Sequence, residues 1–271
     1  MDKGMLLDRL GLAGEDRLAL AKVLDRAEQA EKRNIPAATG FLSPQQQMRA
    51  LDLLRLAGIP ETAYVRQGGY EGAERQIFLF LPDWLEAEDA ESQSPIRRLR
   101  AAWQGTAPFR EDEKLTHRDI LGSLMGMGIV REKVGDILVT SGSADLLVLD
   151  SVAEFLLQSW TSAGRGKLTV SAIGPENLHI PVARRREVRD TVSSLRLDAV
   201  AASGFRLARG KAAALIESGK VRLNWRECVK PDKLLEAGDV VSARGFGKFE
   251  LAEVGGLTRK GRVSIVLQVY V

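Results

Sequence analysis

The stretch "RLARGKAAALIESGKVRLNW", residues 206–225, decides how the C-terminal third of this chain is interpreted. Apolar side chains recur every three or four positions from Ala208 onward, which is typical of one face of a helix. Gly219 is the kind of residue that ends a helix, and the residues after it alternate as those of a strand do. We therefore predict a helix over 208–218 followed by a strand over 221–228.

Three cations lie at the start of this predicted helix: Arg206, Arg209 and Lys211. A cation there destabilises a helix by roughly 0.3–1 kcal/mol, because the N-terminus already carries a partial positive charge. The same cations, beside backbone N–H groups that lack helical partners, form a binding site for phosphate. We interpret the helix start as a phosphate site. The alternative is a helix whose charges only keep it soluble.

Formal charge is unevenly distributed along the 271 residues. Residues 183–271 hold 18 Lys and Arg against 10 Asp and Glu, a net charge of +8. The whole chain holds 39 Lys and Arg against 36 Asp and Glu. Residues 1–182 therefore hold 21 Lys and Arg against 26 Asp and Glu, a net charge of −5. A basic segment joined to an acidic one indicates that the basic segment meets a polyanion. The alternative is an ordinary solvated surface with an uneven charge.

Length and composition set the broad class of the protein. The chain is long enough for two or three domains, and a hydrophobic content of 45% supplies their cores. A single cysteine, Cys228, excludes an internal disulfide and gives no sign of an oxidising compartment. The N-terminus has no apolar run of signal-peptide length, and no stretch approaches the roughly 20 apolar residues of a membrane span. We expect a soluble, cytoplasmic protein with no membrane partner.

Three domains are expected: an N-terminal α/β domain over 1–82, a central domain over 83–180 and a basic C-terminal domain over 181–271. The first is predicted to contain a helix over 15–33, a second helix that Ser43 caps, and two strands around a glycine-rich connection.

The central domain is predicted to follow the order βαββαβ. A strand over 96–103 precedes a helix whose start carries the capping pattern of Thr116 and Asp119. Two short strands, a helix over 151–160 and a strand over 168–173 follow. This order is that of ferredoxin-like and RRM-like domains.

The C-terminal domain is predicted to begin with two short helices, over 195–203 and 208–218. The strand-like stretches that follow lie over 221–228, 239–244, 249–254 and 263–271. The whole chain is therefore expected to belong to the α+β class.

The sequence lacks the usual enzyme motifs. "HRD" at 117–119 resembles a kinase catalytic loop, but the downstream Asn and a Gly-rich phosphate loop are missing, and a capped helix start explains it better. GxSxG, GxGxxG, P-loop and HExxH patterns do not occur. Two histidines and one cysteine, far apart in sequence, do not indicate a zinc site. We expect no catalytic residue, no cofactor and no metal.

Residues 195–247 resemble the S4 RNA-binding domain. The resemblance is carried by "RLD" at 196–198, "AR" at 208–209, "LIESGKVRLN" at 215–224 and "GDVVSARG" at 238–245. It implies that the two helices and the following turn hold structured RNA, usually ribosomal or transfer RNA. The sequence departs from the commonest pattern at Ala208, where Ser or Thr is usual, and at Trp225, where Gly is usual.

The expected RNA contacts are the cations around these helices together with one asparagine. They are Arg184, Arg185, Arg186, Arg196, Arg206, Arg209, Lys211, Lys220, Arg222, Asn224 and Arg226. Alternation along the predicted strand places Trp225 with Val221 and Leu223 on the core face. The alternative is that the Trp225 ring stacks on a base.

The rest of the chain is similar to the YlmH family of S4-domain proteins. The matching stretches are "GFLSPQQQ" at 40–47, "GGYEGAERQIFLFLP" at 68–82 and "LTHRDILGSLMGMGIVREKVGDILV" at 115–139. The resemblance implies a non-catalytic RNA binder linked to the large ribosomal subunit and to the rescue of stalled ribosomes that carry tRNA-linked nascent chains. An RNA-modifying enzyme with a diverged site and a protein–protein adaptor linked to cell division are the alternatives.

The central domain lacks the aromatic signature by which an RRM binds RNA. "DILVT" at 136–140 and "DLLVLD" at 145–150 contain no aromatic residue. If this domain binds RNA, we expect contacts by charge and shape, with Arg131 and Lys133 as the candidates. The alternative is that both belong to a solvated surface loop.

Overall fold

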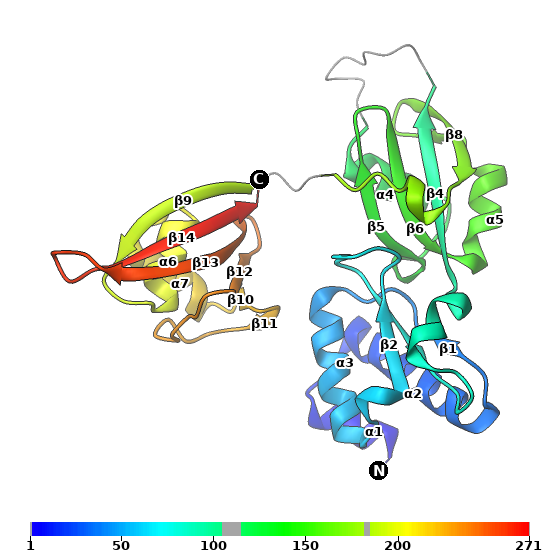
Figure 1. Cartoon of the computed structure of the whole chain (residues 1–271), viewed down its shortest axis with the longest axis horizontal. Coiled ribbons are helices and arrows are strands. Elements are labelled where there is room, and N and C mark those ends of the chain that lie inside the picture. Colours follow the sequence, from blue (N-terminus) through cyan, green and yellow to red (C-terminus); the bar gives the residue numbers. More distant parts are fainter. Residues whose placement is uncertain (1, 105–114, 182–184, 271) are drawn as a thin grey trace. The chain divides into compact units, whose positions relative to one another are not determined.

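The chain forms two compact units, residues 1–181 and 182–271 (Figure 1). The computed structural model describes residues 2–104, 115–181 and 185–270. Helices pack on antiparallel sheets in both units, which confirms the predicted α+β class. The predicted N-terminal and central domains both fall in the first unit, and their separation at residue 82 stays a prediction.

Three helices and a small sheet form the first part of unit 1. The elements are α1 (Lys3–Arg9), α2 (Gly14–Arg33), β1 (Ala37–Ala38), α3 (Pro44–Ala57), β2 (Tyr64–Gln67) and β3 (Ile77–Phe80). Ser43 caps α3 by accepting a hydrogen bond from the Gln46 N–H, and the Gln46 side chain accepts one from the Ser43 N–H. The predicted cap at Ser43 is thus confirmed, and Gly58 ends α3 with a φ of 75°.

The second part of unit 1 has the predicted βαββαβ order with one short extra strand. Its elements are β4 (Ile96–Trp103), α4 (His117–Gly126), β5 (Val134–Val139), β6 (Ser143–Leu149), α5 (Asp150–Ser159), β7 (Ser162–Ala163) and β8 (Gly166–Ala172). The strands pair in the order β5-β6-β4-β8-β7. The first and third main strands therefore lie in the centre, as in a ferredoxin-like sheet. Thr116 and Asp119 form the predicted capping box of α4.

The two helices α4 and α5 cover only one face of this sheet. Ile120 and Leu156, from these helices, join Leu99 and Leu146, from the sheet, in one buried cluster. A second cluster lies on the other face, where β4, β5 and β6 contribute Ile96, Leu138, Leu147 and Leu149, and the N-terminal part contributes Phe41 and Ile77. All seven residues of β6 are buried, as a strand covered on both faces should be. The chain's own N-terminal part therefore packs on β4, β5 and β6 at the sheet face that an RRM exposes to RNA.

A single carboxylate, that of Asp136 on β5, ties the glycine-rich loop after β2 to the central sheet. Its oxygens accept hydrogen bonds from the Tyr70 hydroxyl at 2.8 Å, the Glu74 N–H at 2.7 Å and the Arg75 N–H at 3.1 Å. Burial, followed by the charge of Asp136, raises the pKa of Tyr70 and keeps its hydroxyl a donor. The "GGYEGAERQ" and "GIVREKVGDI" stretches therefore meet in one hydrogen-bonded junction.

Two arginine side chains complete this junction. Arg75 donates to the carbonyl of Val134 at 3.1 Å and to that of Phe41 at 2.7 Å. Arg131 donates to the carbonyls of Val134 and Gly135. Burial lowers the pKa of both arginines, because the charged form loses its hydration.

Unit 2 is a six-stranded antiparallel sheet with two helices on one face. Its elements are β9 (Arg185–Val192), α6 (Leu197–Gly204), α7 (Arg209–Glu217), β10 (Val221–Leu223), β11 (Arg226–Glu227), β12 (Val240–Ala243), β13 (Gly247–Leu257) and β14 (Val263–Tyr270). The strand order is β11-β10-β12-β13-β14-β9. Val200 and Ile216 of the helices pack against Phe249 and Leu267 of the sheet. A Cβ on Gly204 would lie 2.4 Å from the Phe249 ring, so α6 reaches the sheet only with glycine there.

Unit 2 differs from the sequence prediction in two places. The arginine-rich run before α6, for which no strand was predicted, is β9, which pairs along its whole length with β14. The predicted strand over 221–228 is a hairpin, because Asn224 and Trp225 have φ values of 48° and 66° and form a two-residue turn between β10 and β11. Trp225 is therefore a half-buried turn residue, and it is not part of the buried core of the unit. A bulky side chain at such a φ costs on the order of 1 kcal/mol.

None of the helices in the described ranges is long and apolar enough to cross a bilayer.

We predict that Asp136→Ala lowers the free energy of unfolding of unit 1 by about 2–4 kcal/mol, because three donors lose their shared acceptor. Tyr70→Phe removes one of these donors and should cost only about 1 kcal/mol. Pulsed hydrogen exchange across a urea titration of the full chain, read in peptides from 68–76 and 134–139, measures both. Equal stability of Asp136→Ala and wild type would contradict this account of the junction.

Candidate nucleic-acid interface

The carboxylate of Asp198 holds together the starts of the two helices of unit 2. Asp198 lies in the first turn of α6 and is 5% exposed. Arg196 contacts both its oxygens, with Nε at 3.2 Å from Oδ1 and Nη2 at 3.3 Å from Oδ2. Arg209, the first residue of α7, also contacts both oxygens, with Nε at 3.1 Å from Oδ2 and Nη2 at 3.2 Å from Oδ1. Two bidentate guanidinium groups therefore share one carboxylate.

This bridge explains part of the unusual charge at the start of α7. Arg209 is stabilised there by Asp198 and also donates to the Ser193 hydroxyl at 3.3 Å. Within this bridge two guanidinium groups face one carboxylate, and the charge of Asp232 also acts on Arg196. The side chains of Arg196 and Arg209 remain 38% and 48% exposed, so both present N–H groups to solvent.

The two helix starts differ in their backbone groups. At α6, the N–H groups of Leu197 and Asp198 donate to the carbonyls of Lys233 and Pro231, at 2.8 Å and 2.9 Å. At α7, Ala208 provides no side-chain cap, and the residues of the first turn are exposed. The backbone donors of α7 are therefore the ones placed for an anion, with Arg206 and Lys211 exposed beside them.

Hydrogen bonding sets the charge state of Asp198. Burial would raise the pKa of its carboxyl, but the hydrogen bonds and charges of Arg196 and Arg209 outweigh burial and lower the pKa below its ordinary value. The carboxylate is therefore ionised throughout the neutral range, and the bridge is intact there.

The structure divides the predicted contact residues between the two faces of the sheet. Alternation places Arg185 and Arg222 on the face away from α6 and α7, because their neighbours Val188, Val221 and Leu223 pack in the core. The helix-side residues are Arg186, Arg196, Arg206, Arg209, Lys211 and Arg226.

Three predicted residues belong to neither group. Lys220 lies just before β10 and is exposed. Asn224 holds the turn: its Nδ2 donates to Asp239 at 2.7 Å and its Oδ1 accepts from the Val240 N–H at 2.9 Å. Arg184 lies outside the described residues.

The two candidates of the central domain have internal contacts. The Arg131 guanidinium belongs to the Asp136 junction, where it donates to backbone carbonyls. Lys133 donates to the Ser151 hydroxyl at 3.1 Å and is only partly exposed. Their role as RNA contacts stays a prediction.

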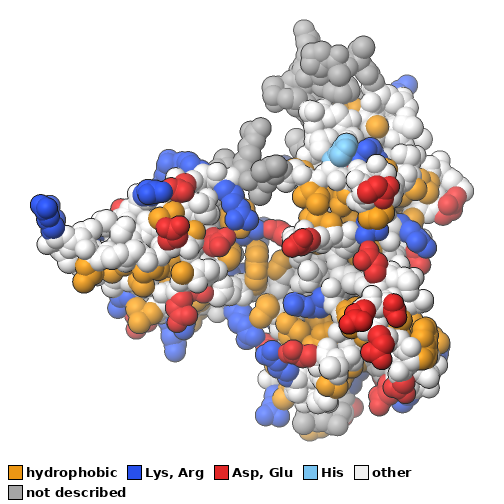
Figure 2. Space-filling view, in the orientation of Figure 1, with side chains coloured by type: hydrophobic (Ala, Val, Ile, Leu, Met, Phe, Trp, Pro, Cys, Tyr) orange, Lys and Arg blue, Asp and Glu red, His pale blue; other side chains and the backbone are white. Residues whose placement is uncertain are grey.

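The sequence analysis did not select the cations at the tip of the β13–β14 hairpin. Arg259 and Lys260 are exposed there, and Figure 2 shows Lys and Arg side chains at this tip, at the left of the view. Arg262 donates to the Thr191 hydroxyl at 2.9 Å, which ties the tip to β9. The clustering of three cations in "TRKGR", with no acid, was the signal available.

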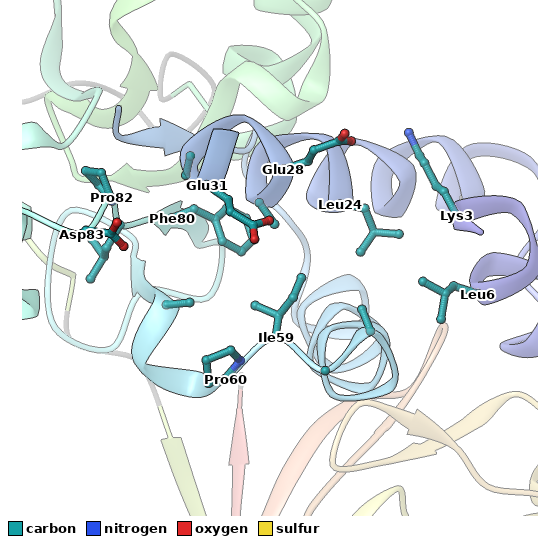
Figure 3. Close-up of a pocket in the computed structure, with 16 residues that line it drawn as sticks. Lys3, Leu6, Leu24, Glu28, Glu31, Ile59, Pro60, Phe80, Pro82 and Asp83 are labelled. Atoms are coloured by element: carbon teal, nitrogen blue, oxygen red, sulfur yellow. The ribbon is translucent and has the colours of Figure 1, made fainter. Parts of the chain in front are cut away.

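A cavity of about 490 Å³ lies in unit 1, between α1, α2 and the end of β3. Figure 3 shows an apolar floor that includes Leu24 and Phe80, with the carboxylates of Glu28, Glu31 and Asp83 at its edge. Neither histidine nor cysteine lines it. Among residues 2–104, 115–181 and 185–270, no three His, Cys, Asp or Glu side chains gather as metal ligands.

Comparisons with known proteins agree with this architecture. The family model "YlmH, N-terminal" matches residues 15–83, "Putative RNA-binding domain in YlmH" matches 110–177, and "S4 domain" matches 195–241. A curated relative from Bacillus subtilis (strain 168), "Ribosome-associated protein quality control protein P2", is 32% identical over 230 residues, which cover 85% of this chain and 86% of the relative. The chain belongs to the YlmH family.

A solved structure, "Cell division protein ylmH from Streptococcus pneumoniae", is also similar to this YlmH-family chain. It shares 23% identity with a TM-score of 0.46, and the match covers 62% of this chain and 97% of that one. The family models and the Bacillus subtilis relative confirm the family expected from the sequence, and the S4 match falls within unit 2 and includes α6 and α7.

We predict that Asp198→Asn lowers the free energy of unfolding of unit 2 by about 2 kcal/mol at pH 7, because two arginines lose their charged partner. The folded-state pKa of Asp198 is lowered, so this contribution is complete above about 3.8 and is lost as the pH falls through the lowered pKa. The difference between variant and wild type should therefore shrink in acid.

Urea titrations with hydrogen exchange read in peptides of unit 2 measure this difference at pH 7 and near pH 3. Glu236→Gln, an exposed acid of the same unit, is the matched control and should change stability by less than about 0.5 kcal/mol. The same loss in both variants would show that the Asp198 bridge is not what stabilises the unit.

Proposed function

We propose that this protein is a non-catalytic binder of structured RNA, ribosomal or transfer RNA, and that the RNA lies against the start of α7. It would act in the cytoplasm, on the large ribosomal subunit, in the rescue or quality control of stalled ribosomes. The observation that carries the proposal is the uncapped start of α7, where Arg206, Arg209 and Lys211 surround exposed backbone donors in a segment that matches the S4 domain.

The geometry of α7 suits phosphate groups. Helix donors and flanking cations bind an anion together, and Arg209 is held in a fixed orientation by Asp198 before any ligand arrives. Phosphate contacts supply affinity and orientation, while the spacing of phosphates on a folded RNA supplies selectivity. RNA-binding and ribosome-associated roles are supported by the matching S4 family model and by the name of the Bacillus subtilis relative.

A non-catalytic role is favoured by the same surface. Its described polar groups include cations, backbone N–H groups, the Ser193 hydroxyl, which accepts from Arg209, and a carboxylate engaged by two arginines. They do not form a pair of nucleophile and base. The unit 1 cavity has a carboxylate edge, which suits a polyanion poorly. An active site would need a set of convergent acid and base groups, which these two places do not offer.

We predict that Arg206→Glu combined with Lys211→Glu weakens binding of a ribosomal RNA hairpin by about tenfold or more and makes the slope of log affinity against log salt shallower by about 2. Both residues are exposed, so the fold should persist. Arg209→Glu is a poorer choice, because it would set a second carboxylate against Asp198. Fluorescence anisotropy at several salt concentrations measures both quantities.

Arg259→Glu combined with Lys260→Glu is the matched control, since it makes the same change of charge at the hairpin tip of the same unit. It should weaken binding less than the α7 variant does. Equal weakening by the two variants would indicate attraction by net charge alone and would refute the site at α7.

A further inference from the structure

Trp225 occupies a backbone conformation that does not suit its side chain. The turn between β10 and β11 needs positive φ at both central residues, which favours Asn followed by Gly. Asn224 is stabilised in this conformation by its hydrogen bonds to Asp239 and Val240. Trp225 has a φ of 66° and stays partly exposed outside the buried core. A bulky residue at positive φ is uncommon, and such strain is concentrated at functional sites.

The ring of Trp225 is part of a cluster of rings and cations. Lys248 Nζ lies 5.1 Å from the Trp225 ring centroid and 4.3 Å from that of Tyr270. The Arg185 guanidinium lies 4.7 Å from the centroid of the same Tyr270 ring. These are the three cation–π contacts of the described parts of the chain, so they are concentrated at one place in unit 2.

Strand register shows that this cluster crosses the sheet on the face away from the helices. Arg222 on β10 lies opposite Ser242 on β12, and Ser242 lies opposite Lys248 on β13. Tyr270 on β14 lies opposite Arg185 on β9. Because Val221, Ala243 and Phe249 alternate with these residues and pack in the core, the row faces away from α6 and α7.

We propose that Trp225 and this row form a second RNA contact, on which unpaired bases stack while the neighbouring cations approach their phosphates. The proposal rests on the proposed function, since it adds single-stranded recognition to the RNA held at α7. We call this row the stacking row; it consists of Trp225, Arg222, Lys248, Tyr270 and Arg185.

The chemistry of the stacking row favours unpaired RNA over the other occupants. Aromatic rings combined with cations bind single strands, because every base offers a π-face whatever its sequence. A duplex hides these faces within its stack. A protein partner would need a contiguous apolar patch, whereas here each ring lies beside a cation.

Acids limit the charge of this face, since Glu250 pairs with Arg185 at 3.4 Å and Glu227 lies opposite Arg222. Stacking, rather than charge, should therefore supply most of the binding free energy at the stacking row.

The test compares two RNA probes on the full chain. One is a blunt-ended ribosomal RNA hairpin, and the other is the same hairpin with a 3′ tail of eight uridines. Wild type should bind the tailed hairpin about tenfold more tightly than the blunt one. Trp225→Gly should remove most of this gain and leave affinity for the blunt hairpin unchanged.

Trp225→Gly also separates binding from folding. Glycine adopts positive φ without strain, so the variant should unfold at the same temperature as wild type or a higher one. Trp225→Phe keeps an aromatic ring and should retain part of the gain from the tail. Trp84→Ala removes an exposed tryptophan of unit 1 and should leave the increase in affinity caused by the tail unchanged. A fall in melting temperature together with a lost gain would assign Trp225 a structural role and overturn the proposal.

Failure of the stacking row is distinguishable from failure of the site at α7. The stacking row is refuted if the tail does not raise the affinity of wild type, or if Trp225→Gly keeps the affinity gained from the tail. Binding of the blunt hairpin would still support the site at α7. If wild type does not bind the blunt hairpin, the proposed function fails, and an octamer of uridine tests the row alone. Its binding should then quench tryptophan fluorescence in wild type and not in Trp225→Gly. Equal quenching in both proteins would overturn the proposal.

Discussion

The shared carboxylate of Asp198 is the constraint on which the helix face of unit 2 depends. It brings Arg196 and Arg209, which come from two different helices, to one buried point. Removing such a carboxylate leaves two cations without a partner beside a helix N-terminus, which is costly at a partly buried position. The bridge thus sets the position of α7 relative to α6, and with it the direction in which the α7 donors point. For the phosphate site proposed at this surface, preorganisation should contribute more to affinity than the number of charges.

Unit 1 contains two junctions that are likewise each held by one carboxylate. Asp136 joins the glycine-rich loop to the central sheet, and Asp145, fully buried on β6, accepts both Nε and Nη2 of Arg100 at 2.7 Å and the His179 N–H at 2.7 Å. The first junction brings the N-terminal part against the sheet, and the second brings the chain after β8 back to it. Both lie on the face that α4 and α5 leave uncovered. The absence of aromatic residues from β5 and β6 then has a structural reason: this face packs against the chain itself.

Local patterns predicted most of the fold, and distant pairings account for what they missed. The cap at Ser43, the capping box at Thr116 and the βαββαβ order depend on neighbours in sequence, and the structure has them all. β9 was missed because its partner β14 begins at Val263, more than 70 residues away, and four arginines in seven residues do not indicate a strand. The cations of unit 2 were identifiable by composition, but the face on which Arg226 lies follows from a hairpin turn at Asn224 and Trp225, where unbroken alternation had predicted a continuous strand.

The turn at Trp225 also changes how the charge of unit 2 is interpreted. A net charge of +8 suggests a single basic surface, yet the sheet separates Arg185 and Arg222 from the cations of α6 and α7. On the helix side, guanidinium groups surround backbone donors, a combination that suits phosphate. On the other side, cations lie against aromatic rings at 4.3–5.1 Å, a combination that suits flat π-systems. A folded RNA with an unpaired extension offers both chemistries in one molecule, so the two faces need not compete for separate ligands.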